Sequence, residues 1–313
     1  MGKICSTNLA DLDCSVCSNL HGNTMNKSIY TLVDDIYDLM ENRNTPDGVD
    51  VDAEIEKFGE AMKDLMKKEF KPSGHYDGRN LRLSAIGKPD RQLWYSANKY
   101  TQEKLKPHNY IKFMYGHMIE EMLLFFTRMA GHTVTDEQKQ CEVEGVKGHM
   151  DARVDGRLID VKSTSSYGFK KFKDGTLAFD DPFGYIAQIK AYAHSEGDDK
   201  FGWLAIDKQN GNLTYLEYDQ TDEQADVYPF ISYDIAQRVR DVKKIIEQPE
   251  PPSLCYDCVE DGKSGNEKLS TGCSYCGYKK HCYPDLRVFL YSTGPRFLSK
   301  VVNEPKVMEI ELA

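Results

Sequence analysis

The spacing of apolar residues predicts helices in the first part of the chain. Apolar side chains recur every three or four residues over 28–41 and over 53–70, and a Thr-Pro-Asp-Gly turn at 45–48 separates the two runs. A third apolar stripe, over 110–130, is longer, and Gly131 supplies its C-terminal stop. We therefore expect a helical hairpin followed by a long helix.

The middle of the chain carries the patterns of strands joined by tight turns. Asp155-Gly156 and Asn210-Gly211 are two-residue sequences that favour β-hairpins. The strands expected around them are 148–154 with 157–162, and 201–207 with 212–218. Helices are predicted from Asp181-Pro182 through about 194 and over 221–246. The resulting order of a helix, three strands, a helix and a strand predicts an α/β fold.

The chain has 313 residues, of which 40% are hydrophobic and 29% charged, as is typical of a soluble globular protein. Lys and Arg number 40 and Asp and Glu number 50, so the net charge is −10. This balance argues against a protein held to nucleic acid by overall basicity, although a small basic channel suffices for an enzyme. Because no long apolar run and no hydrophobic leader occurs, we expect a cytoplasmic protein without membrane contact.

Three parts are expected along the chain. Residues 1–80 hold an N-terminal tail and the helical hairpin, which we interpret as an appendage that packs on a core. The core itself is expected over 81–248. A group of prolines at 249–252 then ends the last helix and introduces a cysteine-rich cap and a C-terminal tail over 249–313.

The turn at Asp155-Gly156 sets the register of its hairpin. Residues pair when their numbers sum to 311, so Asp151 faces Asp160 and His149 faces Lys162. Opposed Cβ atoms lie about 4.5–5.5 Å apart, where like charges destabilise unless a cation lies between them. A divalent cation would provide this charge, and Lys162 shares a face with Asp160. Carboxylates, a metal and a lysine are what phosphodiester hydrolysis needs, whereas the alternative is a surface hairpin with scattered charge.

Four segments, in this order, resemble the motifs of the PD-(D/E)XK nuclease superfamily, in its RecB-like and bacteriophage exonuclease branch. They are Gly116-His117-Met118-Ile119-Glu120, Gly148-His149-Met150-Asp151, Asp160-Val161-Lys162 and Gln188-Ile189-Lys190-Ala191-Tyr192. The resemblance spans roughly residues 80–290. It implies a restriction-endonuclease-like core, in which helices flank a mixed sheet. The sequence departs from the common pattern by having aspartate at position 160, where glutamate is frequent.

The resemblance also implies roles in metal binding and catalysis. Lys162 would be the catalytic lysine, acting with the carboxylates. The ligands of Mg2+ or Mn2+ would be Glu120, Asp151, Asp160 and the carbonyl oxygen of Val161. Glu121 is a rival to Glu120, because neighbouring helical positions point about 100° apart and only one of them can face the hairpin.

Four further residues are candidates for substrate binding. Gln188 and Tyr192 stand at i and i+4 on one helical face, so both can approach a DNA phosphate or support the catalytic lysine. Lys170 and Lys171 follow the third strand and can contact phosphates beside the metal site. Ordinary helix surface and a solvated basic run are the alternatives.

Five cysteines near the C-terminus have the spacing of metal ligands. They are Cys255 and Cys258, Cys273 and Cys276, and Cys282. The last three resemble the Cys-x2-Cys-x-Tyr-x3-Cys element of iron–sulfur RecB-like nucleases, with a fourth ligand from Cys255 or Cys258. A zinc site formed by the two Cys-x2-Cys pairs fits the spacing equally well. Free thiols are the alternative. Near the N-terminus, Cys5, Cys14 and Cys17 are another possible ligand set, although a tail with free thiols is favoured there.

The sequence thus predicts a metal-dependent DNA nuclease with a second, structural metal site at its cysteines. The resemblance points to an exonuclease of phage-type recombination or replication, which would work with proteins of those processes in the host cytoplasm. A structure-specific or CRISPR-associated RecB-like endonuclease is the alternative enzyme. A non-catalytic DNA-binding module with a structural cysteine–metal site is the alternative of another class.

Overall fold

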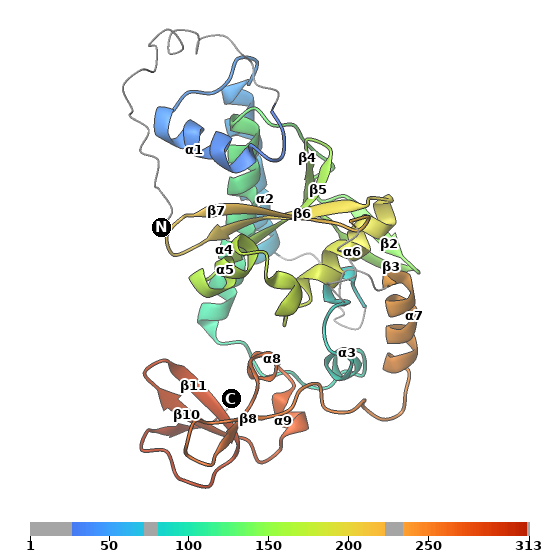
Figure 1. Cartoon of the computed structure of the whole chain (residues 1–313), viewed down its shortest axis with the longest axis vertical. Helices are drawn as coiled ribbons and strands as arrows, with labels where there is room; N and C mark the ends of the chain where they lie inside the picture. The colour runs from blue at the N-terminus through green and yellow to red at the C-terminus, as the bar shows by residue number, and fades with distance from the viewer. Residues whose placement is uncertain (1–26, 72–80, 223–233, 312–313) are drawn as a thin grey trace, which may run out of the picture.

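The computed structural model describes residues 27–71, 81–222 and 234–311, whose arrangement is shown in Figure 1. Its centre is a five-stranded sheet with the strand order β1-β4-β5-β6-β7. β5 and β6 run parallel, whereas the other neighbouring strands run antiparallel, so the sheet is mixed. The strands of this sheet are β1 (Val134–Thr135), β4 (Ala152–Val154), β5 (Arg157–Thr164), β6 (Lys200–Asp207) and β7 (Leu213–Asp219).

Helices cover both faces of the sheet, as the α/β prediction requires. The helices are α1 (Leu32–Asn42), α2 (Val51–Phe70), α3 (Asp90–Ala97), α4 (Pro107–Met129), α5 (Ser166–Lys173), α6 (Tyr185–Glu196), α7 (Ile235–Ile246), α8 (Thr271–Ser274) and α9 (Lys279–Cys282), with 3-10 turns at η1 (Leu83–Ala85) and η2 (Leu177–Phe179). None of the helices in the described ranges combines the length and the apolarity needed to cross a bilayer. Of the predicted last helix, 221–246, residues 223–233 lie outside the described ranges.

Alternate residues of the central strands fill two separate cores. Leu158 of β5 and Trp203 of β6 pack with residues of α5 and α6. Ile159 and Leu204, one position further along, pack with residues of α1 and α4 on the opposite face. By the same alternation Asp160 belongs to the α6 face, where its side chain is buried. The fold therefore places a carboxylate inside an apolar layer.

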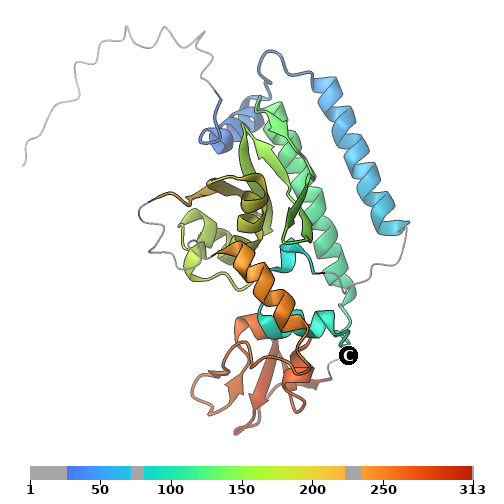
Figure 2. The same ribbon diagram turned by 90° about the vertical axis from the view of Figure 1, so that its right-hand side faces the viewer.

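The predicted helical hairpin contributes unequally to the core. Leu32 and Ile36 of α1 are 0% and 1% exposed, so α1 is part of the core on the α4 face of the sheet. α2 has no buried residue and lies along α4 on the side away from the sheet (Figure 2), with the rings of Phe58 and Phe125 5.0 Å apart. α1 begins at Leu32, later than predicted, because the backbone turns at 28–31 before the helix starts.

The strand predicted over 148–154 is two strands in different sheets, which corrects the sequence-based assignment. β2 (Gln140–Val143) and β3 (Val146–His149) form their own hairpin, and β4 starts only at Ala152. The break occurs because buried Met150 continues the β2–β3 pairing by donating its N–H to the Lys139 carbonyl, so the chain joins β5 only from Ala152. His149 consequently pairs with Gln140 and is exposed, whereas the register had placed it opposite Lys162.

The C-terminal part, beyond the prolines, contains a small sheet that the sequence analysis did not predict. Its strand order is β12-β10-β11-β9-β8. These strands are β8 (Val259–Glu260), β9 (Glu267–Lys268), β10 (Arg287–Tyr291), β11 (Gly294–Lys300) and β12 (Glu309–Ile310). A separate hydrophobic cluster of Trp94, Tyr95 and Tyr278 joins α3 to this part. The indole N–H of Trp94 also donates to the Gln248 carbonyl at 2.8 Å, which fixes the start of the segment.

Candidate active site

Two neighbouring positions on one face of β5 form the centre of the site. Asp160 Oδ2 lies 2.6 Å from Lys162 Nζ, at ion-pair distance but at an angle unsuited to a hydrogen bond. Asp160 Oδ1 accepts a hydrogen bond of 3.1 Å from the Gln188 side-chain amide on α6. The Asp160 side chain is 1% exposed, so both contacts are made away from solvent. The predicted pairing of Asp160 with Lys162 on one face is confirmed.

Asp151 reaches this centre from the break before β4. The turn register is as predicted, because Val154 pairs with Arg157 and Ala152 with Ile159, two pairs whose numbers sum to 311. Asp151 lies one residue beyond the ladder, however. Its Oδ2 accepts the backbone N–H of Val161 at 2.7 Å. The side chain thus replaces a strand partner on β5 and brings its carboxylate beside Asp160.

The third carboxylate, Glu120, comes from α4 on the other side of the strand. Glu120 Oε1 accepts a hydrogen bond of 2.7 Å from the Gln138 amide. α4 passes close to the end of β5 at Gly116, where an added Cβ would lie 3.9 Å from Ser163 Oγ. The charges of Asp160 and Lys162 affect the pKa of Glu120, whereas those of Glu137 and Arg128 affect the pKa of Glu121. The structure therefore directs Glu120 rather than Glu121 to the hairpin.

The electrostatics of the site show three carboxyl groups held close together with little solvent. Burial, followed by repulsion from Asp160, raises the pKa of Glu120 from 4.5 to about 7. Burial and the charges of Asp160 and Glu120 raise the pKa of Asp151 well above its usual value. Burial also raises the pKa of Asp160, although Lys162 opposes the change. Burial would lower the pKa of Lys162, but Asp160 and Asp151 more than reverse this and raise it.

The donor atoms of this cluster suit a hard divalent cation. Three carboxylates face a single lysine, so the fully ionised cluster carries a net charge of −2, and Asp160 Oδ2 is buried without a hydrogen bond. Mg2+ and Mn2+ prefer carboxylate oxygens of this kind. In the described residues, no group of three or more His, Cys, Asp or Glu side chains is already arranged around one point as a metal site. The carboxylates are instead turned toward protein donors, namely Val161 N–H, Gln138 and Lys162.

The candidate substrate residues occupy different environments. Tyr192 is 1% exposed and its hydroxyl receives a 3.3 Å hydrogen bond from the Gln188 amide, so it supports Gln188 from inside the core. Gln188 is half-buried against Asp160. Lys171 forms a 2.6 Å ion pair with Asp180, whereas Lys170 is exposed. Of the four, Lys170 is the one whose charge is openly presented to solvent.

Tyr185 is a site residue that the sequence analysis missed. Lys162 Nζ lies over its ring, 4.9 Å from the centroid, which is a cation–π contact. Tyr185 is the first residue of α6 and stands three positions before Gln188, hence on the same helical face. Its position three residues before Gln188 is the feature of the sequence from which its place in the site could have been predicted.

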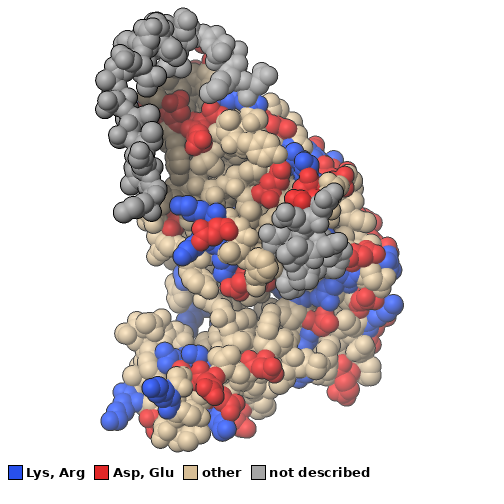
Figure 3. All heavy atoms as spheres, viewed as in Figure 1, with Lys and Arg blue, Asp and Glu red and all other residues tan. Residues whose placement is uncertain are grey.

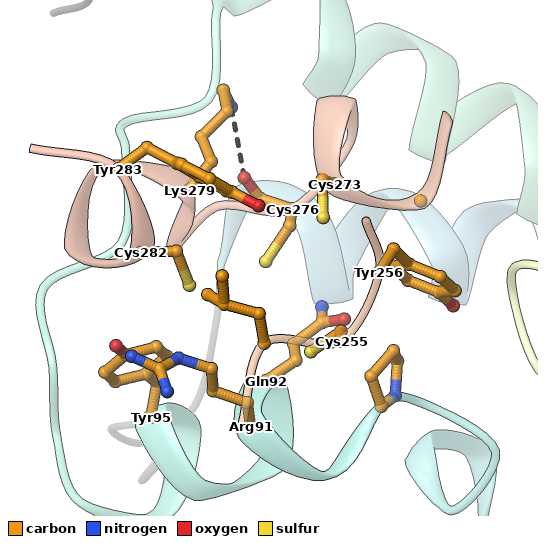
Figure 4. Close-up of a pocket in the computed structure, with 13 residues that line it drawn as sticks. Arg91, Gln92, Tyr95, Cys255, Tyr256, Cys273, Cys276, Lys279, Cys282 and Tyr283 are labelled. Atoms are coloured by element: carbon orange, nitrogen blue, oxygen red, sulfur yellow. Dashed lines mark hydrogen bonds between the residues drawn. The ribbon is translucent and has the colours of Figure 1, made fainter. Parts of the chain in front are cut away.

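The C-terminal cysteines gather around a pocket between α3 and the cysteine-rich segment. Figure 4 shows the sulfur atoms of Cys255, Cys273, Cys276 and Cys282 pointing into this space. Cys258, which is also described, lies outside the lining. Burial, with a smaller contribution from the neighbouring thiols, raises the pKa of Cys255 to about 11. All described cysteines are free thiols, and Cys5, Cys14 and Cys17 lie outside the described ranges.

The sequence matches no family model and no curated protein. Among solved structures, it is similar to an alkaline exonuclease from Laribacter hongkongensis, with 16% identity, 55% of this chain and 91% of that chain covered, and a TM-score of 0.36. A structure of the same enzyme with dAMP shows 14% identity over equal shares, again with a TM-score of 0.36. A phage-related exonuclease from Haemophilus somnus 129PT is 16% identical, with 53% of this chain and 93% of that chain covered, and a TM-score of 0.36. Similarity of this order leaves the chemistry to be inferred from the site's own residues.

Proposed function

We propose that this protein is a DNA nuclease that hydrolyses phosphodiester bonds with the help of Mg2+ or Mn2+. The observation that carries the proposal is the convergence of Glu120, Asp151 and Asp160 on Lys162, in a site where Asp160 is buried and the other three are partly exposed. Such an arrangement destabilises the metal-free protein, because burial and mutual repulsion raise the pKa values of the carboxyl groups. Strongly perturbed groups of this kind gather at functional sites. The motif resemblance supports DNA as the substrate.

The carboxylates of Glu120, Asp151 and Asp160 would hold the cation, together with the carbonyl of Val161 that the resemblance implies. When bound, the cation supplies Lewis acidity toward the phosphate and a water of lowered pKa. The protein's own contribution is to gather the carboxylates and to orient them through hydrogen bonds. The N–H of Val161 orients Asp151, and the Gln188 amide fixes one oxygen of Asp160 and leaves the other directed into the site.

Lys162 acts in this proposal as a fixed positive charge. Because the neighbouring carboxylates raise its pKa above the ordinary value, the ammonium keeps its proton at neutral pH. It therefore serves as a hydrogen-bond donor that orients the attacking water or stabilises negative charge on the phosphate oxygens, rather than as a general base. The ring of Tyr185, 4.9 Å away, restricts the position of the ammonium group.

The test is a cleavage assay on 5′-labelled linear, 3′-labelled linear and circular DNA with Mg2+. Lys162→Ala should lower the cleavage rate about 100- to 1,000-fold, the usual loss when one preorganised electrostatic contact is removed. Lys200→Ala is the matched control, because Lys200 lies on the neighbouring strand β6 but pairs with Asp219 at the surface. Cleavage by Lys162→Ala at the wild-type rate would contradict the assignment.

The same DNA substrates distinguish an exonuclease from an endonuclease and from a non-catalytic DNA-binding module. We propose an exonuclease on the strength of the motif resemblance, and such an enzyme should release nucleotides from linear DNA and leave circles intact. Cleavage of circles would favour the endonuclease alternative. Binding of DNA without any cleavage would favour the non-catalytic binding module.

We further propose that Cys255, Cys273, Cys276 and Cys282 hold a structural metal, as an iron–sulfur cluster or as zinc. The support is their common pocket and the donor type, since thiolates suit both metals. Because Cys282 lines the pocket and Cys258 does not, the favoured ligand set is the one with three closely spaced cysteines plus Cys255. Iron and sulfide analysis of anaerobically purified protein, alongside zinc analysis, distinguishes the two metals.

A further inference from the structure

A row of aromatic rings leads from the proposed active site to the surface. Lys162 Nζ lies 4.9 Å from the centroid of the Tyr185 ring. The Tyr185 and Phe183 ring centroids are 5.6 Å apart, and those of Phe183 and Tyr275 are 5.9 Å apart. We refer to Tyr185, Phe183 and Tyr275 as the aromatic ladder. Because Tyr275 belongs to the cysteine-rich segment, the ladder joins that segment to the active site, and Figure 1 shows the chain just before α6 directly above α8.

The two outer rings of the ladder are open to solvent. Phe183 is 45% exposed and Tyr275 is 74% exposed. Phe183 precedes α6 and Tyr275 follows α8, and Figure 3 shows that the surface is hollowed between the C-terminal part and the rest of the molecule. Leaving aromatic surface in water forgoes roughly 25 cal/mol for each Å² that could be buried. The Phe183 and Tyr275 rings are in contact but tilted by 60° to each other, so each offers its own exposed aromatic surface to a ligand with flat, apolar faces.

The ladder is held rigidly rather than displayed on a loose loop. The Asp181 carboxylate accepts the backbone N–H groups of Gly184, Tyr185 and Ile186 at 3.0, 3.0 and 2.9 Å. Gly184 also has a positive φ of 76° and packs on the backbone of Gly87, where a Cβ at position 184 would lie 2.5 Å from the Gly87 carbonyl carbon. Three hydrogen bonds and the close packing on Gly87 restrain the segment before α6, which lowers the entropic cost of binding a ligand there.

The neighbouring helix α5 adds positive charge and further exposed rings. Its last turn carries Lys170, Lys171 and Lys173. Lys171 Nζ lies over the ring of Tyr167, 5.2 Å from the centroid, and Tyr167 is 74% exposed. Lys171 is paired with Asp180, whereas Lys170 and Lys173 are exposed on this helix. The helix contacts the ladder through Phe172, 6.2 Å from Tyr185 between ring centroids. Exposed lysines and aromatic rings on adjoining elements match a polyanion that also carries planar bases.

We propose that the aromatic ladder binds an unpaired DNA strand whose bases stack on Phe183 and Tyr275, so that the strand is led past the cysteine-rich segment to Lys162. This inference rests on the proposed nuclease function and specifies its substrate as single-stranded at the cleavage point. A duplex could not use the ladder, because its bases are stacked on each other and it offers proteins its phosphates and groove edges. An apolar protein partner is the competing occupant, and the lysines of α5 favour the polyanion over it.

The test measures binding without cleavage, by fluorescence anisotropy of the full-length protein in EDTA. The probes are a labelled oligothymidylate and a labelled blunt duplex. Phe183→Leu and Tyr275→Leu keep an apolar side chain but remove the ring, whereas Phe183→Tyr and Tyr275→Phe keep the ring. The control is Phe70→Leu, since Phe70 is 72% exposed at the end of α2, a helix that lies along α4 on the side away from the sheet (Figure 2).

Each leucine variant should bind the single strand about 5- to 100-fold more weakly, the usual effect of losing one base-stacking ring. Duplex affinity should stay within about twofold, and the two ring-preserving variants and Phe70→Leu should bind like wild type. Unchanged single-strand affinity in the leucine variants would overturn the inference, as would an equal loss for both probes. If the leucine variants have no effect while cleavage still depends on Lys162, only the ladder inference fails. If wild-type protein neither binds nor cleaves DNA, the nuclease proposal fails with it.

Discussion

Replacing Glu120 by glutamine should stabilise the metal-free protein at neutral pH. Glutamine has the shape of a protonated glutamate and keeps an acceptor oxygen for the Gln138 amide, which donates to Glu120 Oε1 at 2.7 Å. It removes only the negative charge that burial and Asp160 oppose. The variant therefore isolates the electrostatic cost of gathering three carboxylates around Lys162.

The size of the effect follows from the pKa of Glu120, which the fold raises from 4.5 to about 7. Because the folded-state pKa is raised, the folded protein binds the proton more tightly than the unfolded chain, and stability falls as pH increases through this window. The loss is about 1 kcal/mol at pH 5 and approaches about 3 kcal/mol at pH 8. These values are upper limits, since the repulsion is shared with Asp151 and Asp160.

The assay is urea unfolding of wild type and Glu120→Gln in EDTA at pH 5 and at pH 8. The variant should gain up to about 3 kcal/mol over wild type at pH 8 and up to about 1 kcal/mol at pH 5. Glu56→Gln is the control, because Glu56 is an exposed glutamate on α2 and its replacement should change the free energy of unfolding by less than about 0.5 kcal/mol. A Glu120→Gln variant that is no more stable than wild type at pH 8, or equally stabilised at both pH values, would refute the reasoning.

Three further results are expected. Asp151→Asn should abolish cleavage in Mg2+ while the metal-free protein melts at or above the wild-type temperature, because a repelling charge is removed; a lower melting temperature would show that the carboxylate is instead stabilising. Mg2+ should raise the melting temperature of wild type by mass action, and Asp160→Asn should lose most of this increase. An equal increase for both proteins would mean that the metal binds elsewhere. Cys276→Ser should give protease-sensitive protein and Cys141→Ser should not; equal protease resistance would contradict a structural metal.

Local features were readable from the sequence because they depend on neighbouring residues. The Asp155-Gly156 turn determines the pairing of β4 with β5, since a two-residue loop permits one register, and the observed pairs follow it. Periodic apolar residues determine α4 and α6, whose helical spacing needs no distant contact. The alternation along β5 likewise determines that Asp160 and Lys162 share a face.

Other features were decided only by tertiary packing. The strand expected over 148–154 breaks because Met150 is buried and extends the β2–β3 hairpin by bonding to Lys139, whereas Ala152 pairs with β5 in the central sheet. For the same reason Asp151 bonds to the Val161 backbone rather than standing in the ladder. Tyr192 shares the helical face of Gln188, yet it is buried because Gly148 allows β3 to approach within contact of its ring.

The cysteine pocket and the aromatic ladder also depend partly on spacing along the chain and partly on tertiary packing. The sequence by itself determined that Cys273, Cys276 and Cys282 are close together, because they are near neighbours along the backbone. Only the tertiary structure decided that Cys255 and not Cys258 completes the pocket, and that Phe183 meets Tyr275. Residues so far apart in the chain are brought together by the packing of α3 against the cysteine-rich segment, and the free energy of that packing comes from a whole cluster of side chains rather than from any short motif.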